Sequence, residues 1–128
     1  MKSQNRVMVF IDGSNLFWSL RRMGLKIDFY KLVSQLLVER SLVRPYYYSS
    51  TSVPPSERQL RFYQALKYQG FTVITKPLVS RQVEQQKVFI DKGLDVALVT
   101  DLLFAAFRNL YDTAILVSGD DDYAPVVD

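Results

Sequence analysis

Hydrophobic and polar positions alternate along the chain in blocks that have the lengths of strands and helices. Residues 7–11 (VMVFI) form a continuous apolar run with β-branched members, which is typical of a strand buried on both faces. Turn residues follow at 12–15, and apolar residues at helical spacing then continue until Gly24 ends the pattern. We therefore predict a strand over 7–11 that leads into a helix over 16–23.

The alternation continues, because each later apolar block shows either helical spacing or a short run bounded by turn residues. The further predicted elements are, in order, a helix over 29–37 capped by Asp28, a strand over 42–48 interrupted by Pro45, a helix from Ser56 to Gly70 with a Ser56–Gln59 capping box, a strand over 71–75 before Pro77, a helix over 94–107 and a strand over 113–118. Residues 78–91 fit either a short hairpin or a loop. The helix over 94–107 is apolar nearly all round, which indicates deep packing against a sheet.

Strands that alternate with helices favour a three-layer α/β fold with a mainly parallel central sheet. The chain has 128 residues, the size of a single domain over 1–128, and its 48% hydrophobic content is enough for one buried core. The sequence stops at Asp128, a few residues after a further predicted helix begins. We therefore expect a domain that lacks its last strand and helix.

The absence of two residue types removes several classes of enzyme. The chain has no cysteine and no histidine, so it forms no disulfide, no thiolate metal site and no Ser-His-Asp or Cys-His nucleophile. Hydrolysis is then left to carboxylates, lysine or metal-activated water. The apolar run at 7–11 is much too short for a secretory signal or a membrane span, so a cytoplasmic protein with no membrane partner is predicted.

The charge balance is informative mainly through its distribution. The chain has 16 Lys and Arg against 13 Asp and Glu, and a net charge of +3 is too small to prove a nucleic-acid partner. Several carboxylates, however, fall in a few short motifs. If these motifs converge on one site, the remaining surface is more basic than the net charge implies.

Two of the acidic motifs directly follow predicted strands. Asp12 follows the first strand, and Asp120 with its neighbours follows the last. In open parallel α/β sheets the ligand site lies beyond the carboxyl ends of the strands. Asp95 begins the helix over 94–107, where the preceding segment could deliver it to the same edge. Convergent carboxylates without histidine or cysteine suit Mg²⁺ or Mn²⁺ rather than zinc.

Each acidic residue also has a purely structural interpretation. Asp12 could form an Asx-turn or cap a helix, and Asp95 could be an ordinary helix N-terminal acid. One member of the 120–122 triplet is expected to act in the same way, although three adjacent carboxylates repel one another and a cation would relieve that repulsion. Asp101 comes six positions after Asp95, off its helical face, so we favour a supporting or structural role for it.

Three separated motifs carry a family resemblance: FIDGSN at 10–15, KGLD at 92–95 followed by Asp101, and VSGDDDY at 117–123. In this order they resemble the NYN domain family, in particular its bacterial and archaeal branch, within the PIN-like nuclease superfamily. The resemblance covers essentially the whole chain. It implies a PIN-like, Rossmann-like sheet, a divalent-metal site of aspartates and cleavage of RNA. Tyr123 stands where the family commonly has phenylalanine.

Carried over residue by residue, the resemblance implies four catalytic metal ligands for Mg²⁺ or Mn²⁺: Asp12, Asp95, Asp120 and Asp122. The residues predicted to contact the substrate or to support these ligands are Asn15, Lys92, Ser118, Asp101 and Asp121, with Lys92 as a phosphate contact. The predicted activity is metal-assisted hydrolysis of RNA phosphodiester bonds. The predicted partner is single-stranded RNA, held by a basic rim around the acidic pocket, and a homodimer is left open.

Two other functions compete with this prediction. One is an RNA-binding or regulatory PIN-like module without catalysis, although all four predicted ligands are present here. The other is a metal-dependent phosphatase, which is disfavoured because Asp12 has Ser14 two positions on rather than a second aspartate. No glycine-rich phosphate loop with Lys-Ser/Thr occurs in the sequence either.

Overall fold

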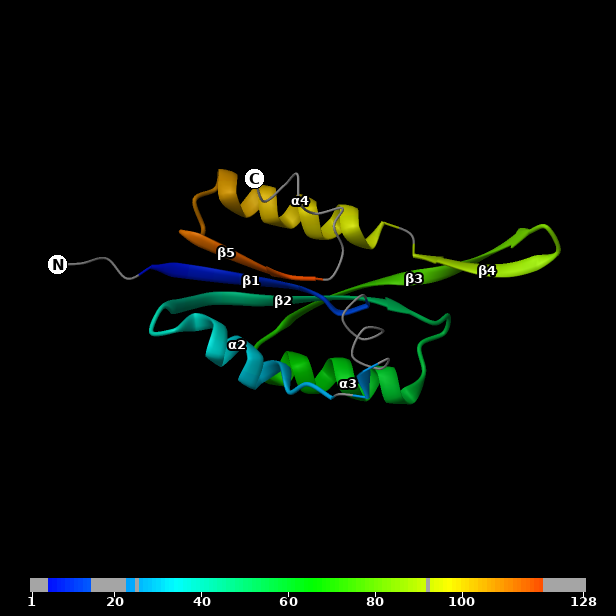
Figure 1. Cartoon of the computed structure of the whole chain (residues 1–128), viewed down its shortest axis with the longest axis horizontal. Coiled ribbons are helices and arrows are strands. Elements are labelled where there is room, and N and C mark those ends of the chain that lie inside the picture. The colour runs from blue at the N-terminus through cyan, green and yellow to red at the C-terminus, as the bar shows by residue number, and fades with distance from the viewer. Residues whose placement is uncertain (1–4, 15–22, 25, 92, 119–128) are drawn as a thin grey trace.

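The computed structural model describes residues 5–14, 23–24, 26–91 and 93–118. Within them the elements are, in order, β1 (Arg6–Asp12), α2 (Phe29–Leu37), β2 (Ser41–Thr51), α3 (Glu57–Tyr68), β3 (Thr72–Val83), β4 (Gln86–Asp91), α4 (Leu94–Phe107) and β5 (Thr113–Val117). Figure 1 shows the sheet with α4 on one face and both α2 and α3 on the other. The predicted three-layer α/β fold is confirmed.

The strands within the described residues form one sheet in the order β4-β3-β2-β1-β5. β1, β2, β3 and β5 are parallel, and β4 is antiparallel to β3, so the prediction of a mainly parallel sheet is also confirmed. β1 lies between β2 and β5, with Asp12 opposite Tyr48 and Ile11 opposite Val117. β1, β2 and β5 therefore end at the same edge, which we call the carboxyl edge and which Asp12, Thr51 and Val117 mark, whereas β3 continues beyond it.

The two faces of the sheet bury separate cores, and the alternation along β1 explains why. Val7, Val9 and Ile11 pack with residues of α2 and α3, whereas Met8 and Phe10 pack with residues of α4. Successive side chains of a strand point to opposite faces. By this alternation Asp12 belongs to the α4 face.

The predicted capping residues begin their helices as expected. The Asp28 carboxylate accepts a hydrogen bond from the Lys31 amide at 3.2 Å at the start of α2. At the start of α3 the Ser56 hydroxyl accepts from the Gln59 amide, and the Gln59 side chain accepts from the Ser56 amide, both at 3.1 Å. Each bond satisfies an amide that has no partner within the helix.

Two prolines predicted to interrupt or end strands lie inside them, and those predictions were wrong. Pro45 pairs with Val9, one residue before β2 begins to pair with β3 at Tyr46, so the missing proline amide costs no bond in the β2–β3 ladder. Pro77 forms the last pair of that ladder. Beyond it β3 changes partner and continues, so it does not end at residue 75.

Residues 78–91 form a hairpin, as one of the two sequence interpretations proposed. β3 and β4 pair from Leu78 with Asp91 to Val83 with Gln86. Glu84 and Gln85 make the turn with φ angles of 49° and 66°. Because β4 pairs only with β3 among the described residues, the hairpin extends past the carboxyl edge as a two-stranded ribbon (Figure 1).

The expectation that α4 packs against the sheet is confirmed, but its apolar character on nearly all sides is not matched by burial on all sides. The buried residues of α4 lie on one stripe at helical spacing: Leu94, Leu98, Leu102 and Ala105. Val96, Leu103 and Phe104 are exposed, and Phe107 is 93% exposed. A helix on a sheet buries one stripe, and no other element of the described chain covers the rest of α4.

An arginine–aspartate pair fastens β1 to the turn before β5, at the edge opposite Asp12. The Arg6 side chain donates to both carboxylate oxygens of Asp112, at 3.1 and 3.2 Å, and its backbone amide donates to the same group at 2.8 Å. The hydrogen bonds from the Arg6 side chain and backbone hold the pKa of Asp112 below its ordinary value. Because both side chains are about two-fifths exposed, water screens this pair.

Two predicted helices fall mostly or wholly on residues that the structure does not describe. The helix predicted over 16–23 lies outside the described residues except for Met23, although the backbone is already helical at Gly13 and Ser14. The helix start predicted after residue 119 lies outside them as well. Among the helices that are described, none is long and apolar enough to cross a membrane.

Candidate active site at the carboxyl edge

Asp12 is a buried carboxylate at the end of the central strand. It is 6% exposed and follows five fully or nearly fully buried apolar residues of β1. Burial of a carboxylate is costly unless other groups compensate its charge. A buried carboxylate in this position is typical of a residue that binds a ligand, because parallel α/β sheets bind their ligands at this edge.

Gly13 is required by a close approach to Tyr47. A β carbon at Gly13 would overlap Cζ and Oη of Tyr47 and would lie 2.6 Å from its Cε2. Tyr47 is 3% exposed, and its ring meets those of Phe29 and Phe62 edge-on, with centroids 5.1 and 5.7 Å away. Because the ring is held between two others, glycine at this position lets the chain turn after Asp12 without displacing Tyr47.

The buried Tyr47 phenol remains neutral, and the charge of Asp12 is one of the influences that raise its pKa. Burial raises the pKa of Tyr47, and the neighbouring Tyr63 and Asp12 raise it further. A protonated phenol adds no negative charge beside Asp12. Tyr47 thus shapes the turn after β1 without making the acidic site more repulsive.

Hydroxyl groups fasten the end of β2 to its neighbours. The Ser50 amide donates to the Ser14 hydroxyl at 2.7 Å, which ties the turn after β1 to β2. The hydroxyls of Ser49 and Tyr63 are 2.9 Å apart and share a hydrogen bond that ties β2 to α3. The Ser50 hydroxyl is buried without a hydrogen-bond partner among the described residues. The two hydrogen bonds thus join the turn after β1, the end of β2 and α3 beside Asp12.

α4 begins at the same edge as Asp12. β4 ends at Asp91 opposite Leu78, adjacent to the pair that joins β3 to the end of β2. Figure 1 shows the N-terminal end of α4 on the side of the molecule where β1 ends. Asp95 is exposed in the first turn of α4, and its Oδ1 accepts from the Val96 amide at 2.9 Å. Asp95 thus lies at the start of α4 near this edge, and its carboxylate accepts a hydrogen bond from its own helix.

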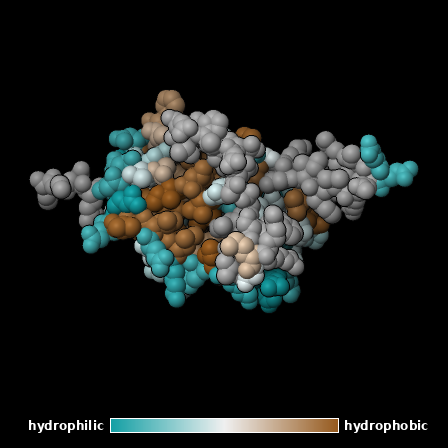
Figure 2. Space-filling model, viewed as in Figure 1, coloured by the Kyte–Doolittle hydropathy of each residue, from teal (hydrophilic) through white to brown (hydrophobic). Residues whose placement is uncertain are grey.

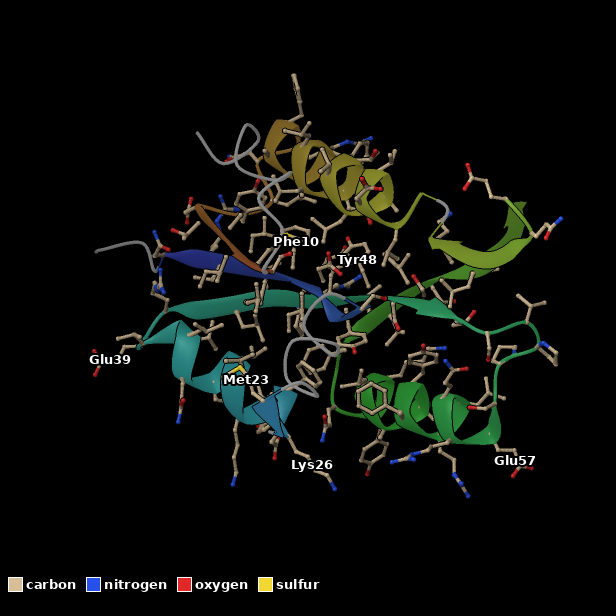
Figure 3. The ribbon with its side chains drawn as sticks, turned by 45° about the vertical axis from the view of Figure 1, so that its right-hand side comes forward. Phe10, Met23, Lys26, Glu39, Tyr48 and Glu57 are labelled. Carbon is tan, nitrogen blue, oxygen red and sulfur yellow. The ribbon has the colours of Figure 1, made fainter. Side chains whose placement is uncertain are left out.

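Asp101 is connected to β2 through a tyrosine. The Tyr48 hydroxyl donates to Asp101 Oδ2 at 2.8 Å, and Tyr48 is fully buried in the strand position opposite Asp12. Figure 3 shows Tyr48 and Phe10 between the sheet and α4. The sequence identified Tyr46 to Tyr48 as sheet residues, and burial agrees with that. It missed the bond to Asp101, although the alternation along β2 puts Tyr48 on the face that α4 covers.

The structure describes four of the predicted site residues. Asp12 and Asp95 lie at the carboxyl edge, Asp101 lies further along α4, and Ser118 follows β5 in a half-buried position. The others lie outside the described residues: Asn15, Lys92, Asp120, Asp121 and Asp122. Among the residues that are described, no three acidic side chains gather into a group of metal-binding size. Convergence of the four predicted ligands therefore stays a prediction.

Comparison with known proteins gives a consistent set of relatives. The family model of the NYN domain matches residues 6–128. "Low amplitude and bright protein LabA" of Synechococcus elongatus is 30% identical over 128 residues, which cover 97% of this chain and 67% of LabA. The crystal structure of a protein of unknown function from Vibrio parahaemolyticus is similar with a TM-score of 0.79 and 26% identity, over 99% of this chain and 75% of that one. These matches show that the chain belongs to the NYN domain family.

Proposed function

We propose that this protein is a metal-dependent ribonuclease that hydrolyses phosphodiester bonds of RNA at the carboxyl edge of its sheet. The observation that carries the proposal is Asp12. Its carboxylate is buried at the end of the central strand and shares an edge with the start of α4, where Asp95 lies. A merely structural aspartate has little reason to occupy such a position, because a helix cap or turn works equally well at an exposed site.

The donor atoms suit a hard divalent cation. Since the chain has no histidine and no cysteine, a metal site here would consist of oxygen ligands, which Mg²⁺ and Mn²⁺ prefer. The residues that would hold the cation are Asp12, Asp95, Asp120 and Asp122. A bound cation supplies an activated water and offsets negative charge on the phosphate.

The remaining groups of the site position Asp12. The strands on both sides of β1 fix its backbone, and Gly13 allows the turn that follows to lie against Tyr47. The Ser14 hydroxyl fastens that turn to the Ser50 amide. The Tyr48 hydroxyl holds the Asp101 carboxylate at 2.8 Å, so that α4 and β2 are coupled beside the site. Rigid placement of this kind is what hydrolysis at a phosphate requires.

Asparagine substitutions test the proposal. Asp12→Asn and Asp120→Asn should abolish most Mn²⁺-dependent cleavage of a labelled single-stranded RNA, with the far-UV circular dichroism unchanged. Without metal, their thermal midpoints should stay level or rise, because each substitution removes a charge from a repulsive cluster. Asp28→Asn is the matched control, since asparagine caps α2 as well as aspartate does. Wild-type cleavage rates combined with lowered midpoints would mean that these aspartates are structural.

A second candidate is an RNA-binding module of the same fold without catalysis. The bond from the Val96 amide to Asp95 favours it, because a carboxylate that accepts a hydrogen bond from its own helix is less available to a cation. Wild-type protein that binds single-stranded RNA but leaves it intact with Mn²⁺ at any concentration would select this candidate.

A further inference from the structure

The layer formed by α2 and α3 is basic, whereas α4 is not. Residues 26–40 and 57–68 contain six basic residues (Lys26, Lys31, Arg40, Arg58, Arg61 and Lys67) against three acidic ones (Asp28, Glu39 and Glu57). Residues 94–108 contain two acidic residues and one arginine. Figure 2 shows hydrophilic residues gathered over the outer side of both α2 and α3. An anionic partner would therefore meet the α2–α3 side of the molecule first.

α3 presents two arginines and a tyrosine to solvent. Tyr63 and Leu66 point into the core, and Arg58, Arg61 and Tyr68 are exposed. Arg58 and Arg61 are one turn apart, and Tyr68 follows two turns after Arg61, 94% exposed. At about 1.5 Å of rise per residue, the three side chains span about 15 Å along the helix. Figure 3 shows nitrogen-tipped side chains projecting from α3 away from the sheet, with Glu57 at one end.

The two arginines are not used by the fold. The ion pair found within the described residues joins Arg6 to Asp112, and neither Arg58 nor Arg61 has a carboxylate within salt-bridge distance there. Glu57 is four residues before Arg61, the spacing of a helix ion pair, yet the two do not form one. α3 also starts only six residues after β2 ends, so Arg58 lies near the carboxyl edge and Tyr68 lies away from it.

We propose that Arg58, Arg61 and Tyr68, which we call the α3 track, bind a single RNA strand and lead it to the carboxyl edge. The proposal rests on the proposed function, because it takes RNA as the substrate of that edge. Phosphate groups complement the two arginines, and an unstacked base can lie on the exposed tyrosine ring. A duplex would keep its bases stacked inside, so the tyrosine favours a single strand.

Binding without cleavage tests the track directly. A labelled oligouridine is titrated in EDTA at several salt concentrations with wild type, Arg58→Gln/Arg61→Gln, Tyr68→Ala, Tyr68→Phe and the control Arg44→Gln. Arg44 is an exposed arginine near the amino end of β2, far from the carboxyl edge. We expect the double variant to bind more weakly and its salt slope to be smaller by about 1.4, roughly 0.7 for each lost phosphate contact. Tyr68→Ala should lower the affinity by about fivefold or more, and Tyr68→Phe should not.

Three outcomes would overturn the proposal. The first is an unchanged affinity and salt slope in the double variant, and the second is an equal loss in Arg44→Gln. The third is equally tight binding of a polyglutamate peptide that Tyr68→Ala leaves intact, which would identify the face as a site for acidic proteins. Failure of the nuclease proposal is separate: it would appear as cleavage that survives Asp12→Asn, measured on the same RNA with Mn²⁺.

Discussion

Replacing Gly13 by alanine should destabilise the protein because the added β carbon would overlap one side chain, that of Tyr47. The backbone at Gly13 is helical, so alanine in an open position would add roughly 0.4–1 kcal/mol of stability. Here the added β carbon would overlap the Tyr47 ring, which is held between Phe29 and Phe62. Overpacking of this kind costs about 1–3 kcal/mol. We therefore expect a net loss of about 1.3 kcal/mol, which lowers Tm by about 5 °C for a domain of this size.

The measurement is urea unfolding of a double-mutant cycle with Tyr47→Leu. If the ring is the obstacle, Gly13→Ala should cost much less once Tyr47 is leucine, with a coupling free energy of at least about 1 kcal/mol. Gly70→Ala is the matched control. A β carbon at Gly70 meets nothing within 4 Å, and its φ of +99° imposes a cost that does not depend on Tyr47.

Two results would refute this reasoning. Gly13→Ala could leave the free energy of unfolding unchanged, which would mean that the ring moves aside at no cost. Alternatively, the substitution could cost the same amount in the Tyr47→Leu background, which would locate the strain in the backbone. In either case the close approach would not explain the glycine that follows Asp12.

Three further predictions concern stability. Val38→Gly should raise the free energy of unfolding by about 1 kcal/mol in urea unfolding, because Val38 ends α2 in the left-handed region and is 70% exposed, so little packing is lost; a loss would contradict this. Tyr48→Phe should lower it by about 1–2 kcal/mol, since Asp101 loses its donor, while Tyr46→Phe should not. Asp112→Asn should destabilise the protein at neutral pH. Because folding lowers the pKa of Asp112, that difference should begin to shrink in acid titrations as pH falls below the ordinary value of 3.8 and should vanish only below the lowered pKa of the folded state; a constant difference would argue against it.

Much of the fold could be predicted from local patterns. Apolar runs located β1 and β5, and the side chains of Asp28 and Ser56 located the starts of α2 and α3. The errors came from inferring the end or interruption of a strand from the residue type alone, without knowing which strands pair beside that residue. Pro45 was predicted to interrupt a strand, yet a proline amide is dispensable wherever the adjacent ladder has not begun. Strand pairing at that level is not visible in one sequence.

The sequence was enough to name the candidate acidic residues of the site, but not the side-chain contacts around them. Asp12 could be placed at the carboxyl end of a parallel strand, and Asp95 at the start of a helix that the preceding segment could bring to the same edge; their convergence stays a prediction. The contacts that position them could not be found in this way. Tyr48 meets Asp101 across 53 positions, and Tyr47 approaches Gly13 across 34, and such separations leave no periodic signal.

The length of the β3–β4 ribbon and the position at which α4 starts are independent of each other. Since β4 runs back along β3, a residue added to each strand lengthens the ribbon without moving the point at which the chain returns beside Leu78. The start of α4, and Asp95 with it, would stay where it is. Insertions and deletions at the tip could thus make the ribbon longer or shorter, with new surfaces there, and leave the carboxyl edge untouched. The surface beyond that edge can therefore change independently of the positions of Asp12 and Asp95.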